Sequence, residues 1–145
     1  MLIGMKAATA MLAPVIALVL WSVVIWGWMY LTRIPAIVGS KMRLDPNRPR
    51  GEQMNELPPK VRWKADNYNH LMEQPTLFYA VALSLAVLGD ASTVALALAW
   101  AYVALRIVHS LVQVLVNHIP TRFVIFFVSS LVLIALTFKA ALLVF

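Results

Sequence analysis

Long apolar runs separated by short polar stretches dominate this chain. The predicted helices lie at about residues 7–31, 66–89, 93–116 and 121–145, and a basic, proline-containing loop occupies residues 32–64. The second helix begins with polar and aromatic residues from Asp66 and continues without a break into an apolar run from Ala80 to Leu88. A spanning helix needs about 20 residues, so each predicted helix is long enough to cross a bilayer. The pattern predicts an all-α membrane protein with four transmembrane helices, organised as a single domain over residues 1–145.

Local signals mark where these helices end or bend. Gly89 stops the second run, and Ser92 is suited to cap the third. The stretch Asn117 to Pro120 separates the third run from the fourth. Pro75 lacks the N–H that would bond to the carbonyl of Leu71, which predicts a kink just beyond Glu73.

Composition supports a membrane protein and explains the positive charge. The chain is 62% hydrophobic and 12% charged, and it carries a formal charge of +6. Most of its 12 Lys and Arg residues belong to the loop, namely Arg33, Lys41, Arg43, Arg48, Arg50, Lys60, Arg62 and Lys64. Positive residues favour cytoplasmic loops, so this charge indicates topology and no nucleic-acid partner. We expect a multi-pass protein of a bacterial inner membrane, with loop 32–64 cytoplasmic and both termini on the opposite side.

Two helices carry polar residues at helical spacing. Asp66, Asn69, His70 and Glu73 fall at i, i+3, i+4 and i+7, which predicts one shared face that points away from the acyl chains. The third helix carries a second polar stripe at the same spacing, made of Arg106, His109, Ser110 and Gln113.

These stripes predict a polar site at the cytoplasmic side. A short turn makes the second and third helices antiparallel, so Glu73 and Arg106 are expected at similar depth and are predicted to pair. His109 is expected either to bond to Glu73 or a carbonyl, or to contact a ligand. Arg122 with Arg62 would close the mouth of a cationic pocket, which suits an anionic amphiphile from the cytoplasm and a lipophilic small molecule from membrane lipid. The scattered histidines do not form a metal site, and the absence of cysteine excludes disulfides and thiolate ligands.

The chain contains three short sequences: Asn-His-Leu-Met-Glu at residues 69–73, Ala-Leu-Arg-Ile-Val-His-Ser at 104–110, and Ile-Pro-Thr-Arg at 119–122. Together they resemble the MAPEG family, the membrane-associated proteins in eicosanoid and glutathione metabolism. The resemblance covers nearly the whole chain. It implies a four-helix bundle that assembles as a homotrimer, with glutathione bound between subunits near the cytoplasmic side.

The same resemblance implies roles for individual residues. Arg122 matches the catalytic arginine that stabilises the glutathione thiolate, and a guanidinium does favour a thiol's charged form. Six further positions are implied at the glutathione site: Glu73, Arg106, His109, His70, Asn69 and Gln113. The chain departs from the family pattern where Asp66 replaces an arginine, Asn69-His70 replaces Arg-Asn, and Gln113 and Phe126 stand where tyrosines are usual.

Two hypotheses follow from these observations. The first is a glutathione-dependent transferase or peroxidase that acts on lipophilic electrophiles or hydroperoxides. The second is a non-catalytic membrane protein that binds another anionic amphiphile or serves a structural role. In the second case the Glu73–Arg106 pair only fixes helix packing, and Arg122 only contacts headgroups.

Overall fold

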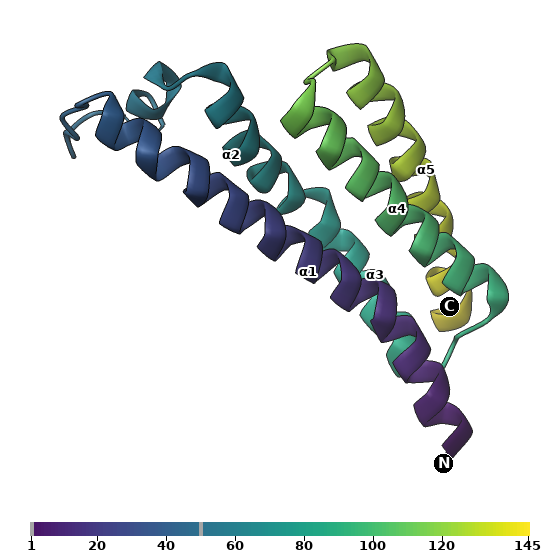
Figure 1. Cartoon of the computed structure of the whole chain (residues 1–145). Helices are drawn as coiled ribbons and strands as arrows, with labels where there is room; N and C mark the ends of the chain where they lie inside the picture. Colours follow the sequence, from purple (N-terminus) through teal and green to yellow (C-terminus); the bar gives the residue numbers. More distant parts are fainter. Residues whose placement is uncertain (1, 50) are drawn as a thin grey trace.

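The computed structural model describes residues 2–49 and 51–145, which form helices joined by short connections (Figure 1). In chain order these are α1 (Leu2–Gly39), the 3₁₀ helix η1 (Gln53–Glu56), α2 (Pro59–Leu71), α3 (Gln74–Val87), α4 (Thr93–Leu115) and α5 (Ile119–Val144). Because α2 and α3 follow one another along α1, they form one broken column of a four-column bundle. The predicted all-α, four-helix membrane fold is therefore confirmed.

Within the described part of the chain, three helices are long and apolar enough to cross a membrane: α1 from Thr9 to Gly39, α4 and α5. The second predicted span differs from them because its apolar part, α3, has only 14 residues. At 1.5 Å per residue α3 is about 21 Å long, shorter than a hydrocarbon core of about 30 Å. The end of the polar helix α2 must therefore enter the membrane to complete this pass.

The first helix is longer than predicted. It continues through Pro35 to Gly39 instead of ending near residue 31, because one missing N–H removes a single bond while apolar residues continue on both sides. The left-handed conformation of Lys41, with φ 53°, follows its end. The polar connection thus covers residues 40–58, which is shorter than the predicted loop 32–64.

The second predicted helix starts earlier and is interrupted. It begins at Pro59 instead of residue 66, with proline in the first turn where a missing N–H is tolerated. The interruption lies at Met72 and Glu73, between α2 and α3, whereas the kink was predicted just beyond Glu73. The bond that Pro75 cannot make would span residues 71–75, so the turn before the proline loosens.

The turn between α3 and α4 follows the predicted signals closely. Gly89 adopts a left-handed φ of 73°, its N–H donates to the Ala86 carbonyl, and the Asp90 N–H donates to the Leu85 carbonyl. These two bonds form a Schellman motif, which requires a residue such as glycine at this position. Ser92 Oγ then accepts from the Ala95 N–H and caps α4.

The helix contacts define where the core lies. α1 packs against α2, α3 and α4, while α5 packs against α4 and α3. Phe78 and Tyr102 stack across α3 and α4 with ring centroids 4.7 Å apart, and both side chains are fully buried. Closer to the polar connection, the Lys64 ammonium lies 5.5 Å from the Trp28 ring and joins α2 to α1.

Candidate functional site: a buried arginine at a helix break

The interruption between α2 and α3 creates the first element of the site. The last carbonyls of a helix have no partner within it, and α2 ends inside the bundle. Arg106 of α4 donates from Nη2 to the His70 carbonyl at 2.9 Å, so it satisfies one of these acceptors. The Arg106 side chain is fully buried, with an exposed fraction of 0%.

Aromatic rings surround this guanidinium. The His70 ring lies 4.9 Å from the His109 ring and 5.2 Å from the Phe126 ring, measured between centroids. The Arg106 guanidinium carbon lies 5.9 Å from the Phe126 ring centre, and its Nη1 is 3.5 Å from His70 Nε2. Helices α2, α4 and α5 therefore converge on one group of side chains, which with the nearby Arg122 we call the arginine–histidine cluster: His70, Arg106, His109, Arg122 and Phe126.

The charge on Arg106 is not paired with a carboxylate. None of the ion pairs formed by residues 2–49 and 51–145 includes Arg106, so the predicted Glu73–Arg106 pair is wrong. Glu73 instead places Oε2 3.0 Å from His70 Nδ1, and its side chain remains 68% exposed. The helix break explains the difference, because Glu73 lies in the interruption and not on the face that α2 turns toward α4.

Arg122 lies at the start of α5, where Asn117 holds it. Asn117 takes the left-handed conformation after α4, with φ 55°, and its side-chain oxygen accepts a hydrogen bond from Arg122 Nη1. Arg122 is also within electrostatic range of His70, His109 and Asp66. A second positive charge thus reaches the cluster from the α4–α5 connection.

Several polar atoms of the cluster and its surroundings are buried without a hydrogen-bond partner in the described part of the chain. They include Arg106 Nε, His109 Nδ1, Gln113 Oε1, Arg122 Nε and Asn67 Nδ2. The bond predicted from His109 to Glu73 or a carbonyl is therefore not made by Nδ1. Buried polar groups are nearly always satisfied, so these atoms mark capacity for hydrogen bonds to water, a ligand or another subunit.

The predicted polar face of the second helix is only partly correct. His70 faces the bundle, but Asp66, Asn69 and Glu73 are exposed. The buried stripe of α2 consists instead of Lys64, Asn67 and Leu71, at i, i+3 and i+7. The apolar Leu71 was the sequence signal that could have identified this face.

Asn67 is a site residue that the sequence analysis missed. Its side chain is fully buried, and its Oδ1 accepts a hydrogen bond from Ser110 Oγ of α4 at 3.1 Å. Gln113 of the predicted stripe is also buried, one turn further along α4. The four residues predicted as a stripe on α4, Arg106, His109, Ser110 and Gln113, all face the bundle, which confirms that orientation.

A neutral network lies beside the cluster on the α3 side. Gln74 Nε2 donates to Ser130 Oγ at 2.8 Å, and the Tyr102 hydroxyl donates to Gln74 Oε1 at 3.4 Å. These bonds link α3, α4 and α5 immediately after the helix break. The network fixes the start of α3, so the break is braced from both sides.

Comparison with known proteins gives the family. A sequence profile of the MAPEG family matches residues 11–142, nearly the whole chain. No curated protein and no solved structure matches it significantly. With three apolar helices able to span a bilayer and a profile match of this extent, the chain is an integral membrane protein that belongs to the MAPEG family.

Proposed function

We propose that this protein binds glutathione, or a related anionic thiol, at the arginine–histidine cluster and presents its thiolate to lipophilic electrophiles or hydroperoxides from the bilayer. The observation that carries the proposal is Arg106, a fully buried guanidinium without a carboxylate partner in the described chain. A buried charge of this kind is costly and is expected at functional sites.

The donor set fits the chemistry of such a ligand. Arg106 Nε, Arg122 Nε and His109 Nδ1 are buried and unpartnered, and the two guanidinium groups are suited to bind carboxylates. Glu73 is exposed beside His70, where it can accept a bond from an ammonium group. Glutathione supplies two carboxylates, one amine and one thiol, so charges of both signs have a counterpart.

The residues of the chain would act on the thiol chiefly through charge. Arg122 favours the thiolate over the thiol by its positive charge, and Asn117 fixes the guanidinium at the start of α5. The thiolate is the nucleophile for conjugation. Its sulfur forms a bond to an electrophilic carbon while a leaving group departs with its bonding electrons, or while the π electron pair of an activated double bond is displaced and takes a proton from water. Phe126 adds no hydroxyl where the family has a tyrosine, so Arg122 would carry this role without a second donor from that position.

Calorimetric titration of the solubilised protein with reduced glutathione tests the proposal. We expect saturable binding that weakens about tenfold or more in Arg122→Gln, since a charge-assisted hydrogen bond contributes about 1.5–3 kcal/mol. Arg33→Gln, which removes a half-buried arginine from α1, is the matched control and should bind as the wild type does. S-methylglutathione, which has no ionisable thiol, tests the role of Arg122 toward the thiolate. It should bind the wild type more weakly than glutathione does, and this difference in affinity should disappear in Arg122→Gln.

The alternative is a non-catalytic protein in which the cluster only holds the broken helix together. The Arg106 bond to the His70 carbonyl specifically favours it, because this bond satisfies the end of α2 whether or not a ligand is present. If a folded wild-type protein shows no saturable glutathione binding, the enzyme proposal fails and the structural alternative replaces it.

A further inference from the structure

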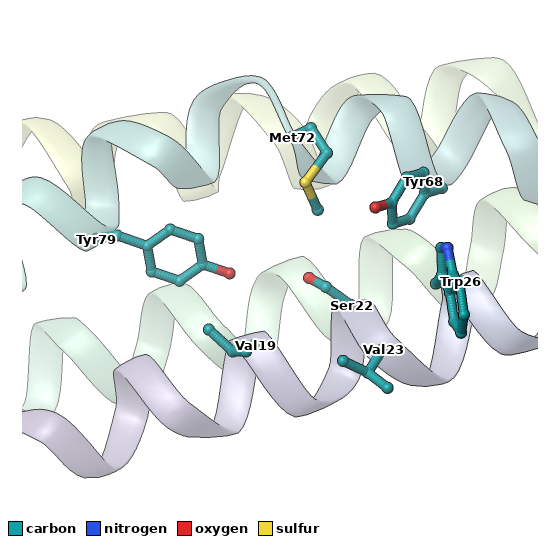
Figure 2. A pocket seen from close by; sticks show the side chains of 7 residues that line it. All are labelled: Val19, Ser22, Val23, Trp26, Tyr68, Met72 and Tyr79. Carbon is teal, nitrogen blue, oxygen red and sulfur yellow. The ribbon is translucent and has the colours of Figure 1, made fainter.

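A hollow of about 320 Å³ lies between α1 and the α2–α3 column, apart from the arginine–histidine cluster. Figure 2 shows its walls: Val19, Ser22 and Trp26 on α1, and Tyr68, Met72 and Tyr79 on the opposite column. Trp26 and Tyr68 stand toward the polar connection, while Val19 and Tyr79 stand toward the chain termini (Figures 1 and 2). Val19 and Trp26 are 40% and 47% exposed, so the hollow is accessible from the side of the helices.

This hollow and the cluster use different faces of α2. Successive helical residues are about 100° apart, so Tyr68 and His70 project in nearly opposite directions. None of the described residues that line the hollow has a charged side chain. The two sites therefore differ in chemistry as well as in position, and an ionised group has no counterpart in the hollow.

The few polar groups of the hollow are not equivalent. Ser22 Oγ donates to the Leu18 carbonyl at 3.0 Å, and Figure 2 shows the Tyr79 hydroxyl directed toward Ser22. The Tyr68 hydroxyl points into the space beside Met72, and it makes no hydrogen bond to the part of the chain that the structure describes. One donor is thus free in a mainly apolar space.

We propose that this hollow binds a neutral lipophilic molecule that carries a hydrogen-bond acceptor, such as the carbonyl of an aromatic ketone or a quinone, with Tyr68 as the donor. Pockets of about 300–1,000 Å³ with apolar walls and few polar groups are typical small-molecule sites. A hydrocarbon would leave the Tyr68 hydroxyl unpaired, and a charged headgroup would lose its hydration without compensation. The ring of Trp26 and the flexible side chain of Met72 provide the apolar contacts.

Photolabelling of the full chain in lipid nanodiscs with benzophenone tests this site. Benzophenone is a neutral aromatic ketone whose excited carbonyl inserts into neighbouring C–H bonds, and mass spectrometry then locates the label. We expect saturable labelling at Met72 and its neighbours in the hollow. Unlabelled 2-acetylnaphthalene should compete about fivefold or more better than 2-ethylnaphthalene, because only the ketone accepts a hydrogen bond from Tyr68.

Two pairs of variants identify the residues. Tyr68→Phe, which changes only the hydroxyl, should remove the advantage of the ketone, while Tyr30→Phe on the outer part of α1 should keep it. Val19→Trp fills the hollow and should abolish the label there, whereas Val94→Trp on an exposed position of α4 should not. Circular dichroism and size-exclusion chromatography establish that each variant is folded.

Three outcomes would overturn the proposal. In the first, 2-acetylnaphthalene keeps its full advantage over 2-ethylnaphthalene in Tyr68→Phe. In the second, the label spreads equally over the lipid-facing residues of α4 and α5. In the third, the wild type remains unlabelled while Val19→Trp changes the oligomer size, which would make the hollow a contact between copies of the chain.

Discussion

Positive charge is paired with a carboxylate near one end of the bundle and is unpaired in the other half. Near the termini, Lys139 of α5 pairs with Asp90 in the α3–α4 turn at 2.9 Å, and the two side chains are 26% and 15% exposed. In the half nearer the α4–α5 connection, Arg106 is fully buried, and no carboxylate of the described residues pairs with it. The first charge is paired within one chain, whereas the second retains a donor, Arg106 Nε, without a hydrogen-bond partner among the described residues.

The two arrangements also predict different effects of substitution. The ion pair joins the α3–α4 turn to α5 within one chain, so its loss should change stability alone. Burial of the unpaired Arg106 guanidinium costs free energy, and its bond to the His70 carbonyl and the nearby Phe126 ring counteract this cost. Substitutions at the arginine–histidine cluster should therefore change stability and, under the proposed function, glutathione binding as well.

The largest effect is expected at the unpaired arginine. Arg106→Met removes a charge-assisted hydrogen bond and leaves the His70 carbonyl without its donor, so the free energy of unfolding should fall by about 2 kcal/mol. Denaturant titration followed by circular dichroism measures this change. Arg33→Met, on a half-buried position of α1, is the control and should change stability by less than about 0.5 kcal/mol. Equal stability of Arg106→Met and wild type would show that Arg106 does not support the end of α2.

An intermediate effect is expected at the paired end. Burial would raise the pKa of Asp90, but hydrogen bonds from Lys139 and Ser92 outweigh it and hold the pKa below its ordinary value. The stability from this carboxylate is present above the unfolded-state pKa of 3.8 and is lost as pH falls through the lower folded-state pKa. Asp90→Asn should thus lower stability by about 1 kcal/mol at neutral pH.

Thermal unfolding at several pH values checks this prediction. The difference between Asp90→Asn and wild type should shrink as the pH falls below 3.8. Asp45→Asn, which alters an exposed carboxylate in the polar connection, should not reproduce that pattern. A difference that stays constant with pH would mean that the charge of Asp90 does not contribute.

The smallest effect on stability is expected at Glu73. Its pair with His70 is largely exposed, so Glu73→Gln should change the free energy of unfolding by no more than about 0.5 kcal/mol. If Glu73 binds the amine of glutathione, the same substitution should weaken the calorimetrically measured affinity severalfold. If Glu73→Gln lost stability but kept its affinity for glutathione, both predictions would be wrong and the role of Glu73 would be structural.

Much of the fold was predictable because the signals are local. The turn at Gly89 and Ser92 depends on one left-handed residue and one side-chain cap, and both act within a few residues of the chain. The polar stripe of α4 was also predicted correctly, because an uninterrupted helix of 23 residues keeps one phase along its length. The buried face of α2 was predicted incorrectly: Asn67 and Leu71 are buried, while Asp66, Asn69 and Glu73 are exposed.

The sequence by itself determined the membrane class, the four helical columns, the break near Pro75 and the family resemblance, since apolar length, proline and short motifs act locally. Only the tertiary structure decided which polar groups meet. It placed Arg106 on the His70 carbonyl, left Glu73 exposed, and opened a hollow beside Tyr68. The physical reason is that an interrupted helix changes direction at the break, so contacts beyond it depend on how the columns pack.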